Sequence, residues 1–375
     1  MKKTILICIS ALVLAFTSVV KADISISGYQ EFFVGNSNQT ILSGATEHGV
    51  AKGGFSNGRY SRITANYNTT LDSGIDVAGV YTVNARDCDG SRTGNCGVVN
   101  FNNIAFSGSF GTINLGETFD TGAGMLSRMT ATVPTNEPDG SMLSHYYTGG
   151  AAASYNFGSG NEANYADNSM KIKYFSNVYS GFSFGAGFTP NIVADGAAGD
   201  DAQAGGVTNS KYTSFTDILS VTGKYAAEID GIGLEVAYGM INGNAGEVAA
   251  VNYNDLEETV YSAKISYANF SADYRKNEAG DSGQIKNNNA GNDEGTSICA
   301  AYQMANIGIG ACQVDTNFTD TSNFDNNSKT RTYSADYNLG GGMKIGIVYF
   351  DLEQVANNAT ITDVDGIVSK LSVGF

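Results

Sequence analysis

The chain of 375 residues contains 47 Gly, 21 Tyr and 19 Phe, but only 3 Pro and no Trp, and its formal net charge is −16 at pH 7. That charge argues against nucleic acid as a partner, and no apolar run of about 18 residues beyond the N-terminal region supports a membrane-spanning helix. A mean hydropathy of −0.14 would class the protein as soluble. A transmembrane barrel gives the same low value, because half of each of its strands is polar.

The N-terminal segment has the three parts of a secretory signal peptide. Two lysines follow the initiating Met, residues 5–16 are mostly apolar, and Val20-Lys21-Ala22 offers a cleavage site with small residues. The apolar run is too short to span a membrane. Residues 1–22 are therefore predicted to be a signal peptide.

The rest of the chain, 23–375, repeats segments in which apolar and polar residues alternate. In one of them Ile63 and Tyr67 share a face, and Arg62 and Thr64 share the opposite face. A period of two is typical of a strand with one apolar and one polar face. The segments predicted as strands are 23–34, 59–69, 76–86, 99–107, 112–118, 170–177, 182–189, 217–227, 232–241, 259–267, 270–276, 296–304, 307–315, 331–339, 344–352 and 364–375.

Very short and much longer connections alternate between these segments. Tight turns such as 108–111 and 305–306 join neighbours, whereas the long connections are rich in Asn, Asp, Gly, Ser and Thr. This layout predicts a single all-β domain, a transmembrane antiparallel up-and-down barrel of about 16 strands, closed because a free edge in lipid leaves backbone groups unpaired. The long connections are 35–57, 87–98, 119–168, 191–215, 242–257, 277–295, 316–329 and 353–363.

A soluble β-sandwich or propeller would need a buried core and visible blade repeats. No such repeat is found.

Aromatic side chains with outward parity are expected to form bands at the two membrane interfaces. They are Tyr81, Tyr174, Tyr225, Tyr238, Tyr267, Tyr337, Tyr349 and Phe375.

The last nine residues alternate without interruption and end on an aromatic residue. A strand of this kind has one face for lipid and one for water. The positions with outward parity are Ile367, Ser369, Leu371, Val373 and Phe375.

Two stretches carry a family resemblance. The C-terminal strand resembles the closing strand of outer-membrane barrels of the porin type, which finish on Phe. The stretch 110–118 (FGTINLGET) resembles the fifth strand of Gram-negative general diffusion porins, whose next loop folds into the lumen and narrows it. By this resemblance 119–168 is the constriction loop, and Leu371, Val373 and Phe375 form the signal read by the outer-membrane barrel assembly machinery.

The resemblance also implies a function. It implies a water-filled channel in the outer membrane of a Gram-negative bacterium, without enzymatic activity or a cofactor, for passive diffusion of small hydrophilic solutes and ions. It further implies a homotrimer in contact with outer-membrane lipid. The acidic net charge favours cations near the protein, although solvated acidic loops alone would give the same total.

Porins narrow the lumen between basic wall residues and acids on the constriction loop. The usual acidic Pro-Glu-Phe-Gly-Gly-type motif is absent here, and 133–140 is only loosely similar. Alternation gives four cations inward parity, and they either shape selectivity or simply lie in a solvated lumen. These cations are Arg62, Arg86, Lys171 and Lys173, and the candidate acids are Asp120, Glu137 and Asp139.

Four cysteines remain after the signal peptide, an even number that suits an oxidising compartment. Cys88 and Cys96 close a small loop, where a disulfide is favoured over a metal site because His is scarce. Centring a hairpin on residues 305–306 places Cys299 and Cys312 opposite each other with inward parity. This arrangement predicts a second disulfide.

The residues favour a general channel over several other functions. A hydrolytic barrel needs a His-assisted nucleophile, and the chain has only His48 and His145, both in predicted loops. A sugar-selective channel would need more inward aromatic residues than Tyr29 and Phe175. The acidic net charge of the chain argues against a phosphate-selective channel. A structural or adhesive barrel would have a plugged lumen. The acidic pairs Asp200-Asp201 and Asp293-Glu294 are candidates for weak Ca²⁺ binding.

Overall fold

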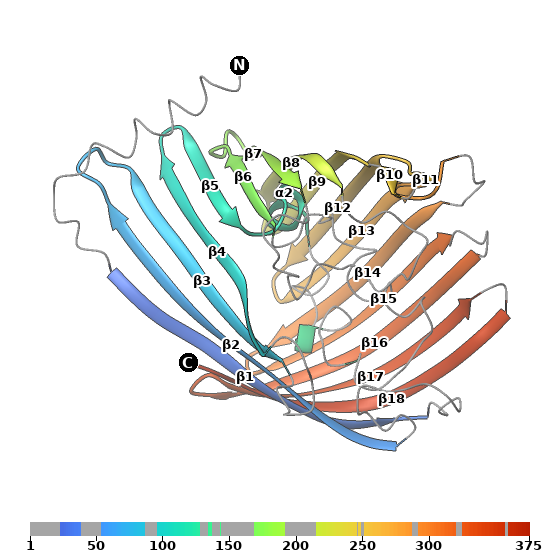
Figure 1. Ribbon diagram of the computed structural model, residues 1–375. Coiled ribbons are helices and arrows are strands. Elements are labelled where there is room, and N and C mark those ends of the chain that lie inside the picture. Colours follow the sequence, from blue (N-terminus) through green and yellow to red (C-terminus); the bar gives the residue numbers. More distant parts are fainter. Residues whose placement is uncertain are drawn as a thin grey trace.

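A computed structural model describes residues 23–38, 54–86, 96–127, 134–136, 143, 169–191, 215–245, 247–248, 251–286, 292–319, 325–356 and 359–375. Sixteen antiparallel strands form a closed barrel in which consecutive strands are neighbours and β1 pairs with β18 (Figure 1). The barrel strands are β1 (Asp23–Ser37), β2 (Gly54–Thr70), β3 (Asp76–Arg86), β4 (Cys96–Gly108), β5 (Gly111–Glu117), β6 (Met170–Phe175), β7 (Phe182–Asn191), β8 (Thr216–Ile229), β9 (Ile232–Asn244), β12 (Leu256–Tyr267), β13 (Phe270–Gly280), β14 (Asp293–Met304), β15 (Ile307–Thr319), β16 (Asp325–Gly340), β17 (Met343–Ala356) and β18 (Ala359–Gly374). The predicted fold and all sixteen predicted strands are confirmed.

Short turns close one end of the barrel as predicted. In the turn between β8 and β9, Asp230 and Gly231 both have positive φ, 52° and 78°. The backbone of such a two-residue turn matches the right-handed twist of the strands on either side, and Gly and Asp adopt this conformation readily. Alternation and turn chemistry together therefore fix the register on each side of the turn.

Several strands extend further into the predicted loops than alternation indicated. The strand β2 begins at Gly54 instead of 59, β16 begins at Asp325 instead of 331, and β18 begins at Ala359 instead of 364. These added residues are mostly polar. Beyond the lipid layer both faces of a strand are wet, so the pairing continues where the apolar alternation has already stopped.

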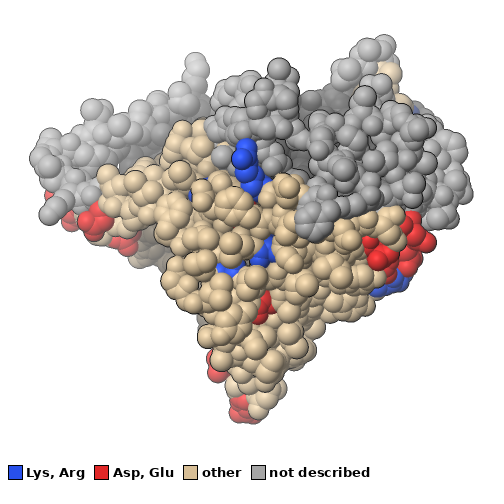
Figure 2. All heavy atoms as spheres, turned by 90° about the horizontal axis from the view of Figure 1, so that it is seen from below, with Lys and Arg blue, Asp and Glu red and all other residues tan. Residues whose placement is uncertain are grey.

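The outer face of the barrel carries exposed apolar and aromatic side chains. Ile63 on β2 is 55% exposed, and Ile345 on β17 is 49% exposed. Residues other than Lys, Arg, Asp and Glu make up most of the described surface in Figure 2, and acidic residues gather near its edges. Six of the eight residues expected in the aromatic bands are exposed outside: Tyr81, Tyr238, Tyr267, Tyr337, Tyr349 and Phe375.

Two short helical elements follow β5, inside the sequence predicted as the constriction loop. The helix α2 (Thr121–Met125) packs against β7, β8 and β9, and the 3₁₀ turn η2 (Pro134–Asn136) packs against β15, β16 and β17. The helix α2 and the turn η2 therefore contact different sides of the barrel wall (the strands are labelled in Figure 1). Outside the barrel, β10 (Glu247–Val248) and β11 (Val251–Asn252) form a two-stranded sheet.

None of the helices in the described part of the chain has the length and apolar character needed to cross a membrane.

Candidate functional site

Arg62 on β2 lies on the inner face of the barrel among three aromatic rings. Its Cζ is 5.8 Å from the ring centroids of Tyr29 and Tyr60 and 5.9 Å from that of Phe101. Its Nε donates to Asn84 Oδ1 at 2.8 Å, and Nη2 donates to the Tyr60 hydroxyl at 2.9 Å. Cation–π contacts and these hydrogen bonds fix the guanidinium without neutralising it. The inward placement predicted for Arg62 is confirmed, and the wall formed by β1–β4 carries a fixed positive charge.

Lys171 and Lys173 on β6 also lie inside the barrel, but the chain that leaves β5 covers them. Lys171 Nζ donates to the Thr118 carbonyl and lies 4.0 Å from Asp120 Oδ1. Lys173 Nζ donates to the Phe119 carbonyl at 2.8 Å. The two lysines are 4% and 6% exposed, and Asp120 is 1% exposed. The structure thus brings Asp120 to a basic wall residue as expected, although all three charges are buried and hold the start of the loop.

An apolar cluster lies inside the barrel where α2 ends. Leu126 packs against inward side chains of β8, β9 and β12. The next residue, Ser127, donates from its backbone to Ser262 Oγ at 3.0 Å and from its hydroxyl to Asp273 Oδ2 at 3.2 Å. We call this cluster the first inner patch; it consists of Leu126, Phe215, Ile218, Ala237, Ile241, Leu256 and Val260.

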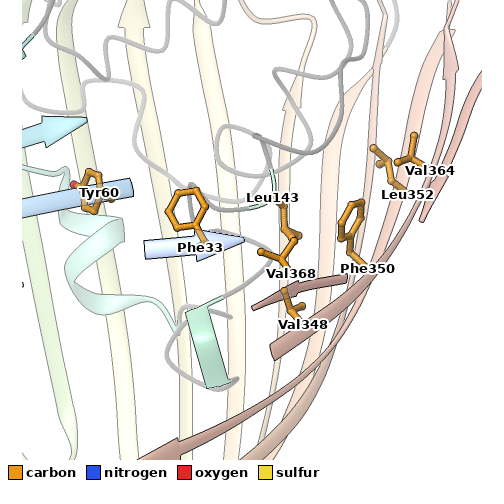
Figure 3. Packing of buried hydrophobic residues seen from close by; sticks show 8 residues of the cluster. All are labelled: Phe33, Tyr60, Leu143, Val348, Phe350, Leu352, Val364 and Val368. Atoms are coloured by element: carbon orange, nitrogen blue, oxygen red, sulfur yellow. The ribbon is translucent and has the colours of Figure 1, made fainter. Parts of the chain in front are cut away.

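A second apolar cluster lies on the wall formed by β17, β18 and β1. Leu143, from the sequence predicted as the constriction loop, lies near Val368 and Phe350 (Figure 3) and is fully buried. We call this cluster the second inner patch; it consists of Phe33, Tyr60, Leu143, Val348, Phe350, Leu352, Val364 and Val368.

These two patches depart from the predicted pattern, in which each strand has one apolar face outside and one polar face inside. On β17, Val348 and Phe350 have inward parity and are fully buried. An inward apolar side chain avoids water only if another apolar group covers it, and Leu126 and Leu143 do so. The inner wall is therefore apolar in two sectors, where the chain that enters the lumen is attached.

Elsewhere inside the barrel, cations and acids form pairs. Lys224 pairs with Glu235, Lys344 Nζ lies 3.4 Å from Asp336 Oδ2, and Lys370 Nζ lies 3.0 Å from Glu31 Oε1. Paired charges of opposite sign leave little net field at a distance.

The remaining predicted constriction residues cannot be placed as side chains. Glu137 and Asp139 lie outside the described residues. Arg86 pairs with Tyr60 in the β2–β3 ladder, but its side chain lies outside the described part of the chain.

The disulfide predicted within the hairpin of β14 and β15 is present. Cys299 and Cys312 are directly opposite in the ladder, joined to each other and buried on the inner face. For the other predicted disulfide, Cys88 lies outside the described residues, as does the side chain of Cys96 on β4.

The C-terminal strand closes the barrel. Phe375 N donates to the Gly28 carbonyl, and Gly28 N donates to the Phe375 carbonyl, both at 3.0 Å. Leu371 and Val373 lie on the outer face beside β1, with Leu371 opposite Phe32. The outward parity predicted for the last residues is confirmed; their reading by an assembly machinery stays a prediction.

The two acids proposed for weak Ca²⁺ binding at 293–294 lie in β14 and not in a loop. Asp293 is buried and accepts from Gln284 Nε2 at 3.2 Å, whereas Glu294 lies 3.3 Å from Lys276 Nζ. Successive residues of a strand point to opposite faces, so these carboxylates do not converge on one ion. Asp200-Asp201 lies outside the described residues.

Several inner residues were missed by the sequence analysis. Tyr60 and Phe101 around Arg62, and the pair Glu31–Lys370, have inward parity that alternation already shows. Their partners come from other strands, which alternation within one strand does not reveal. The anchoring roles of Leu126 and Leu143 have no sequence signal, because both lie in irregular chain.

A family model described as Gram-negative porin matches residues 9–359. The chain belongs to the Gram-negative porin family. Its fold is also that of solved porins, at low sequence identity. Salmonella typhi OmpF in complex with daunomycin matches at TM-score 0.64 and 14% identity, over 94% of this chain and 97% of that chain. A search of curated proteins found no match.

Two further solved structures are similar over the same share of this chain. In-vitro folded OmpT of Vibrio cholerae, in a trimer form, has a TM-score of 0.58 and 12% identity over 94% of this chain and 99% of that chain. A mutant of the Rh. blastica porin has a TM-score of 0.55 and 15% identity, over 94% of this chain and 100% of that chain. As a member of this family, the protein is an outer-membrane diffusion channel.

Proposed function

We propose that this porin passes small hydrophilic solutes and ions with a preference for cations, as a homotrimer and without catalytic activity. The observation that carries the cation preference is the state of the inward lysines. Lys171 and Lys173 are buried against the loop, and Lys224, Lys344 and Lys370 each pair with a carboxylate. These five lysines are therefore covered or paired in the described lumen, whereas Arg62 stays a fixed positive charge, and the whole chain has a net charge of −16.

The trimer is supported by a structural relative. The solved Vibrio cholerae protein is described in a trimer form, and its fold covers nearly all of this chain. A catalytic role finds little support in the composition, since the two histidines of the sequence are its only candidates for an imidazole base.

A sugar-selective channel gains some support from the inner wall. Tyr29, Tyr60 and Phe101 all lie inside the barrel near Arg62, whereas the sequence analysis expected only Tyr29 and Phe175 there. Aromatic faces of this kind stack on sugar rings. Conductance that saturates with, or is blocked by, one sugar would favour this second function over general diffusion.

The reversal potential in planar bilayers with asymmetric KCl tests the cation preference. We expect the sign that corresponds to K⁺ passing more easily than Cl⁻. The double variant Glu137→Gln/Asp139→Asn should lower the K⁺ to Cl⁻ permeability ratio by about twofold, because these acids belong to the predicted constriction loop.

A matched control is Asp72→Asn, in the exposed turn between β2 and β3, which should leave the ratio unchanged. A wild-type channel that prefers Cl⁻ would overturn the proposed preference.

A further inference from the structure

The turn η2 fits a socket on the wall formed by β15, β16 and β17. A Cβ built on Gly346 of β17 would lie 2.6 Å from Thr135 Cγ2, and one built on Gly308 of β15 would lie 3.0 Å from Pro134 Cγ. A contact of 2.6 Å is closer than real Cβ atoms come, so a side chain at position 346 would displace the turn. At Gly308 a Cβ would first meet Asp336 Oδ1 at 2.6 Å and Gln303 Oε1 at 2.9 Å, so Gly346 provides most of the space in which the turn is seated.

A buried lysine holds the turn in this socket. Lys370 of β18 is 8% exposed; its Nζ donates to the Thr135 carbonyl at 2.8 Å and pairs with Glu31 at 3.0 Å. Ser372 Oγ donates to the same Glu31 oxygen at 3.2 Å. A buried ammonium needs such partners, since an unpaired one is strongly disfavoured. The bond to Thr135 is therefore part of what satisfies Lys370.

The backbone of Thr135 shows that the turn is held under constraint. Its φ is 66°, in the left-handed region, which a β-branched residue adopts rarely. Such a conformation persists where the surrounding contacts over-determine it. Here those contacts are the glycine socket and the charged hydrogen bond from Lys370.

We propose that Lys370 is a positioning residue that sets the permeability of the channel by fixing η2 against the wall. This inference rests on the proposed function. Thr135 belongs to the sequence predicted as the constriction loop, so the bond from Lys370 holds this loop to the wall at Thr135. Release of η2 should therefore change the open cross-section and the charge beside it.

The first test compares Lys370→Met, which keeps much of the side-chain volume, with Lys370→Arg, which keeps the charge. We expect Lys370→Met to change single-channel conductance by about twofold and to move the reversal potential, and Lys370→Arg to restore most of both. Heat-modifiable migration in SDS gels verifies that each barrel is assembled. A role confined to folding would leave the conductance of assembled channels unchanged.

A second variant changes the same socket through a residue of another strand. Lys370 lies in the closing strand, where a substitution can impair assembly, so Gly346→Val is made in parallel. Its side chain would collide with Thr135 and should change the conductance in the same direction as Lys370→Met. If both variants assemble and conduct like the wild type, the proposal is wrong.

The labelling rate of a cysteine at position 135 measures the attachment of η2 independently of conductance. In Thr135→Cys, reaction with a maleimide reagent should be slow, because Thr135 is buried, and at least about tenfold faster when Lys370→Met is added.

These measurements separate two failures. A wild-type protein that does not conduct in bilayers contradicts the proposed function, whatever the labelling rate shows. A wild-type protein that conducts, with faster labelling but unchanged conductance and reversal potential in Lys370→Met, contradicts the role of Lys370 and leaves the proposed function standing.

Discussion

An arginine at position 63 should destabilise the assembled barrel, whereas an arginine at position 64 should be tolerated. Ile63 lies on the outer face, and Thr64 lies on the inner face, where its hydroxyl is 3.1 Å from that of Thr82. Arginine on the lipid face is expected to destabilise the folded barrel by roughly 2–4 kcal/mol near the bilayer midplane. At the inner position the loss is about 1 kcal/mol, that of one hydrogen bond.

The measurement is urea unfolding of both variants in phospholipid bilayers, with assembly followed by heat-modifiable gel migration. A second comparison comes from β17, where the native inward Lys344 precedes the outward Ile345. Ile345→Arg should be as harmful as Ile63→Arg. If the variants at 63 and 64 are equally stable, the account of one face in lipid and the other in water is wrong.

Truncation of the two anchoring leucines should weaken the attachment of the loop at opposite walls. Leu143→Ala removes the side chain that covers the second inner patch, and Leu126→Ala does the same at the first inner patch. A buried leucine truncated to alanine is expected to lose about 2–5 kcal/mol. The two sites share no residue, so their effects should be additive within about 0.5 kcal/mol.

Proteolysis of the assembled channel measures this effect, because a detached loop is cleaved more readily. We expect faster cleavage within 119–168 for each variant and the fastest for the double variant, while the barrel strands stay protected. Leu219→Ala, on the outer face of β8, serves as a control with the same substitution. Cleavage rates equal to those of the wild type would show that the leucines do not anchor the loop.

The alternation of apolar and polar residues was enough to predict every barrel strand and the closed topology. It worked because lipid and the lumen impose opposite requirements on neighbouring side chains. It failed at strand ends such as Gly54 and Asp325. Both faces of the strand contact water there, so the paired residues show no alternation of apolar and polar side chains.

The inner surface was harder to predict than the barrel. In β17, Ile345 and Ile347 face outward while Val348 and Phe350 face inward, so the strand is apolar on both sides. Such a run does not reveal whether water or another segment covers the inner side. Likewise, alternation places Lys171 inside the barrel but does not show that residues 118–120 bury it.

The pair Glu31–Lys370 is a further contact that alternation within one strand does not reveal. Its members belong to the first and last strands, and they meet only because the barrel closes through β1 and β18. Parity assigns each of them to the lumen, whereas the contact of Lys370 with Thr135 depends on where the loop meets the wall.

The most direct test is an accessibility scan with spin labels at consecutive positions 233–238 of β9 in liposomes. Labels at Leu234, Val236 and Tyr238 should be accessible to dissolved oxygen, which concentrates in hydrocarbon. Labels at Gly233 and Glu235 should respond instead to a water-soluble nickel complex. Accessibility without a two-residue period, or with the two probes exchanged, would contradict a barrel that faces lipid outside and an aqueous passage within.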